Sequence, residues 1–133
     1  MKKGKSVTKY VADWLARAAE DIQVAEILLK GGSLPNSICF HAQQAGEKYF
    51  KAFLAFQGKN VRKVHDLNAL LTLCLDIDAS FNELKSEADS LDKFYTETRY
   101  PGNYPEFTFK EAENALQAAI RIKGFVLSKI KNE

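Results

Sequence analysis

Apolar residues recur at the 3.6-residue spacing of an α-helix along almost the whole sequence, and no segment alternates apolar and polar residues like a half-buried strand. The only proline before residue 100 is Pro35, so long helices can run without interruption. One face of the first expected helix is lined by Val7, Val11, Trp14, Ala18, Ile22, Ala25 and Leu29. Such a face must be buried against another element. The pattern therefore predicts an all-α fold.

Turn and capping residues divide this pattern into separate helices. We expect helices over about residues 7–30, 35–57, 65–75, 79–97 and 108–131. Ser33 and Asp66 are candidate N-caps, Thr108 and Glu111 form a capping box, and Gly58 ends the second helix. Long helices joined by short connections predict an up-and-down antiparallel bundle of four to five helices.

The length and composition fit one globular domain. The chain has 133 residues, of which 46% are hydrophobic, enough to bury a core without disulfides or a structural metal. We expect a single helical domain over residues 1–133, with residues 1–6 as a flexible basic N-terminus. No apolar run approaches the ~18 residues of a membrane span, and no apolar segment of a signal peptide follows the basic start.

Cys39 and Cys74 both lie within apolar helical patterns. We interpret them as buried thiols in a reducing, cytoplasmic compartment, with a disulfide as the alternative. No Cys or His pair has the spacing of metal ligands, so the sequence predicts no metal site and no cofactor.

The charges are unevenly distributed. The net charge of +2 argues against a general coat for duplex DNA, because such domains are strongly basic. Residues 34–65 nevertheless carry five bases and one acid (+4), whereas residues 66–98 carry two bases and eight acids (−6). This polarity suits an anionic ligand on one side and a basic partner on the other, or simple attraction between neighbouring helices.

A polar strip runs along the second helix beside its apolar face. His41, Gln44, Lys48 and Lys51 are spaced at i, i+3, i+7 and i+10. Lysines in such a strip are either a solvated helix face or a binding surface for an anion. His41 lies at the seam between the polar strip and the apolar face.

Asp21 interrupts the apolar face of the first helix. An unpaired carboxylate there would be costly, so Asp21 should meet a cation or a set of N–H donors. The candidates are His41, Lys48 and Arg99. The two interpretations are a polar hub that fixes the register of the bundle and a group that takes part in proton transfer.

A second polar hub is expected at Asp92, with Tyr95 and Arg99 at i+3 and i+7. Arg99 leads directly into the turn that begins with Tyr100. A guanidinium beside two tyrosines suits the recognition of phosphate or carboxylate groups. It suits equally well the tethering of the following loop through backbone carbonyls.

His65 follows a basic loop that contains Lys59, Arg62 and Lys63. His65 could contact an anion, act as a base, or pack the loop against the bundle. The sequence contains no glycine-rich phosphate loop, nucleophile elbow, HExxH or paired CxxC motif, so no standard class of small-molecule enzyme is indicated.

Four motifs occur in a characteristic order along nearly the whole chain. They are Trp14-x3-Ala18-x2-Asp21, then Cys39-Phe40-His41-Ala42-Gln43-Gln44-Ala45-Gly46-Glu47-Lys48-x2-Lys51-Ala52, then His65-Asp66-Leu67, then Thr98-Arg99-Tyr100-Pro101. In these motifs the chain resembles the small prokaryotic HEPN domain proteins, in their Arg-Tyr-Pro branch. The resemblance implies a helical bundle, commonly a homodimer, with a nucleotide- or RNA-binding role. It also implies a separately encoded minimal nucleotidyltransferase as partner in a toxin–antitoxin pair.

The sequence departs from the ribonucleases of that family at one motif. Those enzymes typically carry an Arg-x4-6-His motif in a metal-independent RNA-cleaving site. Here the nearest match is Arg62-Lys63-Val64-His65, with only two residues between Arg and His. Catalysis is therefore left undecided, and the sequence leans against an enzyme.

Three functions remain as hypotheses. The first is a nucleotide- or RNA-binding module, with ligand contacts from His41, Lys48, Lys51, His65, Tyr95, Arg99 and Tyr100. The second is a metal-independent ribonuclease toxin, for which His41, His65 and Arg99 are the candidate catalytic residues. The third is a purely structural protein that forms a dimer or binds a partner protein. None of the three places the chain at a membrane.

Overall fold

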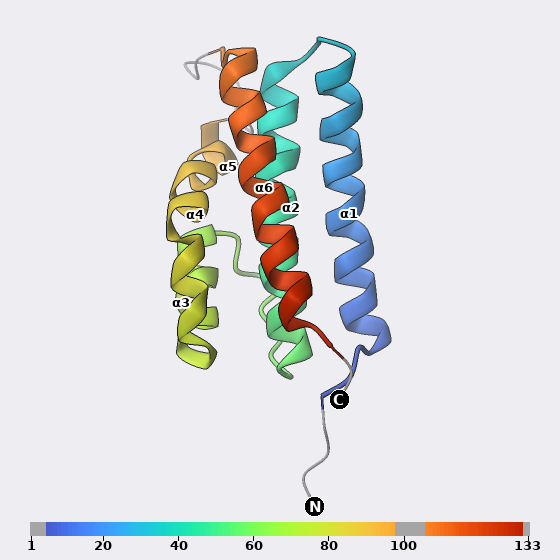
Figure 1. Cartoon of the computed structure of the whole chain (residues 1–133), viewed down its shortest axis with the longest axis vertical. Helices are drawn as coiled ribbons and strands as arrows, with labels where there is room; N and C mark the ends of the chain where they lie inside the picture. Colours follow the sequence, from blue (N-terminus) through green and yellow to red (C-terminus); the bar gives the residue numbers. More distant parts are fainter. Residues whose placement is uncertain (1–4, 98–105, 132–133) are drawn as a thin grey trace, which may run out of the picture.

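The computed structural model describes residues 5–97 and 106–131, and all regular elements in these two ranges are helices. In chain order they are α1 (Lys9–Lys30), α2 (Pro35–Phe56), α3 (Leu67–Ile77), the 3-10 helix η1 (Ala79–Leu84), α4 (Lys85–Asp92), α5 (Phe94–Glu97) and α6 (Phe109–Lys129). The predicted all-α bundle is confirmed. Along the long axis α1 runs in one direction, and α2 and α6 run in the other (Figure 1). The segment from α3 to α5 folds down and back along their flank (Figure 1).

The predicted caps of two helices are confirmed. Asp66 caps α3, because its side chain accepts the N–H groups of Asn68 and Ala69. Thr108 and Glu111 form the predicted capping box at the start of α6, each side chain accepting the other's backbone N–H. These ends are fixed by local sequence, which is why the sequence predicts them well.

The prediction that Ser33 caps α2 is wrong. The backbone N–H of Ser33 instead donates to the Leu28 carbonyl at 3.3 Å and so closes the end of α1. The N-cap of α2 is Leu34, which adopts left-handed φ and ψ angles of 56° and 60° and makes no side-chain capping bond. The short turn leaves no room for a separate capping residue, and Pro35 begins α2 without needing an N–H partner.

The helix expected over residues 79–97 is divided into η1, α4 and α5. Asp78 has extended backbone angles, and its side chain accepts the N–H of Ser80, so the chain restarts there as a 3-10 turn. A second interruption falls at Lys93, between α4 and α5. Both α4 and α5 contact α2.

The hydrophobic core is built around α2, which contacts all the other α-helices. Its side chains on several faces, including Phe50, Phe53 and Leu54, are fully buried within the chain. Gly46 allows close packing, since a Cβ there would meet Ile122 and Leu91 side-chain carbons at 3.3 Å. A long helix that is apolar on several faces therefore finds its cover in the same chain.

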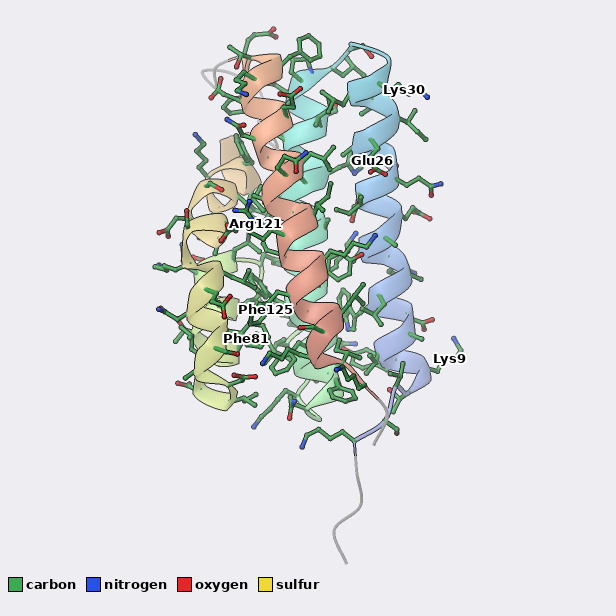
Figure 2. All side chains as sticks on the ribbon, viewed as in Figure 1. Lys9, Glu26, Lys30, Phe81, Arg121 and Phe125 are labelled. Carbon is green, nitrogen blue, oxygen red and sulfur yellow. The ribbon has the colours of Figure 1, made fainter. Side chains whose placement is uncertain are left out.

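An aromatic cluster fills the lower half of the core. Phe81 packs face to edge against Phe125, with ring centroids 4.9 Å apart (Figure 2). Cys39 and Cys74 are buried free thiols, as predicted, and burial raises the pKa of Cys39 to about 12. Within the described ranges, no helix is both long and apolar enough to cross a membrane.

Candidate functional site

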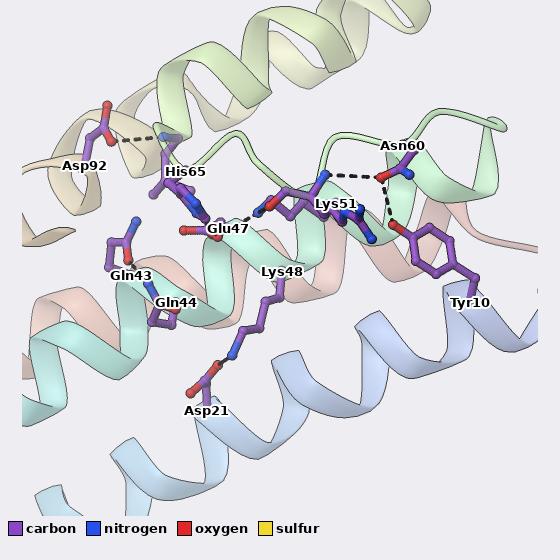
Figure 3. Close-up of polar contacts among 12 residues, drawn as sticks. Tyr10, Asp21, Gln43, Gln44, Glu47, Lys48, Lys51, Asn60, His65 and Asp92 are labelled. Atoms are coloured by element: carbon purple, nitrogen blue, oxygen red, sulfur yellow. Dashed lines mark hydrogen bonds and ion pairs between the residues drawn. The ribbon is translucent and has the colours of Figure 1, made fainter.

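Asp21 on α1 is bound by two side chains of α2. The imidazole Nδ1 of His41 lies 2.8 Å from Asp21 Oδ1. The ammonium of Lys48 donates to Oδ2 at 2.6 Å (Figure 3). Two of the three predicted candidates thus meet this carboxylate. Their side chains are partly accessible, with 29% of His41, 22% of Lys48 and 11% of Asp21 exposed. We call these three residues the Asp21 cluster.

Glu47 is the centre of a second, more deeply buried group. Its Oε2 accepts from the Lys51 ammonium at 2.9 Å and lies 3.0 Å from His65 Nδ1 (Figure 3). Only 5% of the Glu47 side chain and 2% of Lys51 are exposed, against 46% of His65. We call these residues the Glu47 cluster. It places a charged pair inside the bundle and an imidazole at the surface.

Lys51 has two further contacts that account for its burial. Its ammonium donates to the carbonyl of Arg62 at 2.8 Å and lies 5.2 Å from the centre of the Trp14 ring. Lys51 therefore does not belong to a solvated helix face. Its charge is used within the protein to hold the segment that follows α2.

Asp92 accepts hydrogen bonds from the first residues of α3. Its carboxylate accepts the N–H of Leu67 at 2.9 Å (Figure 3). It also accepts from the side-chain amide of Asn68 at 3.0 Å. Burial, followed by a hydrogen bond shared with Asp66, raises the pKa of Asp92. The same shared bond, followed by the N–H groups at the start of α3, lowers the pKa of Asp66. Asp92 is thus a polar hub in the structure.

Tyr95 and His65 lie together beside this hub. Their rings stack with centroids 5.6 Å apart and planes 8° from parallel. Tyr95 also lines a cavity of ≈ 310 Å³ with Asp66, Asp92 and Lys93. The stacked pair therefore stands at the edge of a cavity that presents two carboxylates and one ammonium.

The contacts of the two histidines fix their tautomers. A carboxylate oxygen can only accept, so the Nδ1 of His41 and of His65 must each carry the proton that is shared with Asp21 or Glu47. In a neutral ring the other nitrogen, Nε2, is then an acceptor. Each imidazole is oriented as a histidine general base is when a carboxylate holds its Nδ1–H.

The structure brings most of the predicted site residues to one side of α2, between α1 and the segment leading into α3 (Figure 3). His41 and Lys48 face α1, whereas Lys51 and His65 converge on Glu47. Arg99 and Tyr100 lie outside the described residues. No group of three or more metal-ligating side chains occurs among residues 5–97 and 106–131.

Glu47 is the functional residue that the residue-by-residue reasoning missed. The available signal was its position as the only acid between residues 34 and 65, four residues before Lys51. An isolated carboxylate at i, i+4 from a lysine in a basic segment is suited to pair with it. Gln43 is likewise fully buried one turn earlier, with its Oε1 accepting from Gln44 at 2.7 Å.

Comparison with known proteins identifies the family to which this bundle belongs. The HEPN domain family matches residues 11–130, and the chain is a member of this family. A protein named "Putative toxin MJ1304" from Methanocaldococcus jannaschii is 32% identical over 125 residues, covering 84% of this chain and 82% of that protein.

Two solved structures share the fold. TT1696 from Thermus thermophilus has a TM-score of 0.79 and 32% identity, and the match covers 92% of this chain and all of that one. ST0689, described as an archaeal HEPN homologue, has a TM-score of 0.74 and 34% identity, and the match covers 98% of this chain and all of that one. The resemblance stated from the sequence motifs is thereby confirmed.

Proposed function

We propose that this chain is a nucleotide- or RNA-binding HEPN module that works as a homodimer beside a minimal nucleotidyltransferase in a toxin–antitoxin pair. The observation that carries the binding role is the stacked pair of His65 and Tyr95 at the edge of the ≈ 310 Å³ cavity. Aromatic rings at a surface give a nucleobase a face on which to stack. The toxin name of the archaeal relative supports the second part of the proposal.

The charges around the cavity assign different parts of a nucleotide to different residues. The carboxylates of Asp66 and Asp92 repel a phosphate but can accept from a base amino group or a ribose hydroxyl. The phosphate is then directed to Lys48, the partly exposed lysine of the polar strip. Lys48 uses one of its three donors on Asp21 and keeps two for an anion. We assign the same role to Arg99 from the sequence.

Calorimetry with a panel of nucleoside mono- and triphosphates tests the binding role. We expect Lys48→Ala and Arg99→Ala to weaken binding through the phosphate, and Tyr95→Leu and Tyr100→Leu to weaken it by about 1–3 kcal/mol if a base stacks there. Lys30→Ala, at an exposed lysine in the last turn of α1, is the control and should leave binding unchanged. No detectable heat at millimolar ligand would rule the proposal out.

The partner role is tested separately by co-purification. A tagged chain should recover the product of a neighbouring nucleotidyltransferase gene and should behave as a dimer in light scattering. A stable monomer that recovers no such partner would contradict this part and leave the binding role to be decided by calorimetry.

A ribonuclease is the second candidate, and it rests on the orientation of the histidines. His41 and His65 each place Nδ1 on a carboxylate, at 2.8 and 3.0 Å, which leaves Nε2 to accept a proton from a ribose hydroxyl. Lys48 or Arg99 would stabilise the charge that develops on the phosphate. RNA incubated with EDTA-treated protein should then be cut, and His65→Gln should slow cleavage by about 10²–10⁴-fold. Intact RNA after that incubation would eliminate this candidate.

A further inference from the structure

The segment after α2 runs back along that helix and is tied to it at several points. We call residues 59–65 the basic loop. Its backbone donates from Lys59 to the Leu54 carbonyl at 2.8 Å and accepts from Lys51 at the Arg62 carbonyl, also at 2.8 Å. His65 Nδ1 meets Glu47 at the far end. The loop is therefore ordered by the bundle.

Further contacts hold the loop on its inner side. The hydroxyl of Tyr10 on α1 donates to Asn60 Oδ1 at 3.1 Å. Val61 and Val64 pack against the hydrophobic core, and the N–H of Val64 donates to the Val61 carbonyl at 3.0 Å. With the apolar side chains turned inward, the basic side chains of the same loop stay at the surface.

The cations of the loop are unpaired within the part of the chain that the structure describes. Arg62 and Lys63 are exposed, and neither side chain forms an ion pair or hydrogen bond with a described residue. Lys59 is also exposed but lines a cavity that it shares with Asp76. Arg62 and Lys63, which lie next to His65 in the chain, are therefore the cations that the loop offers to a ligand.

We infer that the basic loop is a binding arm for the sugar–phosphate backbone of single-stranded RNA, with Arg62 and Lys63 contacting phosphates beside a base that stacks at His65 and Tyr95. This inference rests on the proposed function and assigns its ligand class. An ordered, exposed run of cations next to an aromatic pair is the combination found in single-strand binding sites.

Two observations favour a strand over a single nucleotide or a duplex. The phosphate of a single nucleotide can bind at Lys48, so the additional cations of the basic loop are suited to a ligand with further phosphates. The net charge of +2 is too small for a protein that coats duplexes. In this arrangement Lys51 and Glu47 are positioning residues, because they fix the loop and the imidazole from inside the bundle.

The experiment compares two double variants of the full-length chain. Arg62→Ser/Lys63→Ser removes two charges from the basic loop. Lys30→Ser/Lys110→Ser removes two exposed charges, one at the end of α1 and one at the start of α6, and these two helix ends lie at the opposite end of the bundle (Figure 1). Fluorescence anisotropy measures binding of a labelled single-stranded oligoadenylate of about 12 nucleotides. Calorimetry with AMP on the same variants measures binding of a mononucleotide.

We expect the loop variant to bind the oligonucleotide more weakly while it binds AMP as the wild type does. The slope of log affinity against log salt should fall by about 1.4, because each phosphate contact on a single strand contributes about 0.7. A fourfold rise in salt should thus weaken the wild type about sevenfold more than the loop variant. The Lys30/Lys110 variant should keep the wild-type slope.

Four results would overturn the inference. If both double variants lose the same amount of affinity for the oligonucleotide, binding depends on the net charge of the protein and not on the basic loop. If the wild type binds AMP but not the oligonucleotide, the inference of strand binding is wrong and the proposed nucleotide binding stands. If it binds neither, both proposals are wrong. If polyglutamate at equal charge concentration displaces the oligonucleotide, the basic loop binds acidic polymers in general, such as an acidic protein, and is not specific for RNA.

Discussion

The Asp21 and Glu47 clusters have the same chemistry and different depths. Each consists of a carboxylate, a lysine ammonium and a histidine bound through Nδ1. In the Asp21 cluster the carboxylate comes from α1 and the two partners come from α2, so the contacts join two helices across a partly open surface. In the Glu47 cluster the ion pair lies within α2 and is buried, and only the histidine reaches solvent.

Depth determines what each cluster contributes to the protein. Partly exposed charges keep much of their hydration, so the Asp21 cluster can exchange a contact for a ligand at modest cost. Buried charges cannot, because an unpaired charge inside the bundle retains a large desolvation penalty. We therefore expect the buried Glu47–Lys51 ion pair to govern stability and loop position, and the exposed His65 together with the Asp21 cluster to govern ligand contacts.

Glu47→Ala should destabilise the fold most. The substitution leaves the ammonium of Lys51 buried without its carboxylate, and breaking a buried ion pair costs about 3–5 kcal/mol. Urea unfolding followed by circular dichroism measures the loss. The double variant Glu47→Met/Lys51→Met is the control, since it removes both charges and should regain most of the stability. If the double variant is no more stable than Glu47→Ala, the buried charge is not the cause.

Asp21→Ala should cost less, about 1–2 kcal/mol, because His41 and Lys48 can return to water when their acceptor is lost. The same urea titration measures it. The matched control is Asp13→Ala, which breaks an exposed pair with Lys9 and should change stability by about 1 kcal/mol or less. A loss for Asp21→Ala as large as that for Glu47→Ala would abolish the contrast between the clusters.

The sequence predicts the features of this fold that depend on neighbouring residues. Helical periodicity and the caps at Asp66 and Thr108 are local signals, and the structure confirms them. The division of residues 79–97 into three short helices is different, because it depends on how the chain returns from α3 to α2. Ser33 has good capping chemistry, but α2 begins at Pro35, so Leu34 and not Ser33 occupies the N-cap position.

The candidate site is predictable only in part, for the same reason. Asp21 stands out because a carboxylate on an apolar face needs a partner, and the candidates follow from the polar strip of α2. The burial of Lys51 cannot be read from its helix position, because it is caused by Trp14 of another helix and by the loop that folds back over it. Stacking of His65 on Tyr95 likewise joins residues that are far apart in the sequence.

The weakest effect we predict concerns the hub beside the Glu47 cluster and takes the form of a pH dependence. The pKa of Asp92 is raised in the folded chain, mainly by burial, so the folded state holds a proton more tightly than the unfolded chain does. As the pH falls from about 7 toward the ordinary carboxyl pKa of about 4, folding therefore gains stability from Asp92. The amide of an asparagine does not take up a proton in this range, so an Asp92→Asn variant should lack this gain.

Urea unfolding at several pH values gives the midpoint of the wild type and of Asp92→Asn. The midpoint of the wild type should rise relative to that of the variant as the pH falls. Asp66 contributes with the opposite sign, because its pKa is lowered and its stabilisation is lost only as the pH falls below the ordinary range. Asp89→Asn on α4 is the contrasting variant, because hydrogen bonds with Lys85 and Asn68 lower the pKa of that carboxyl, so this substitution should leave the gain at falling pH in place. A difference in midpoint that stays constant across this pH range would show that the pKa of Asp92 is the same in the folded and the unfolded chain, and would contradict the prediction.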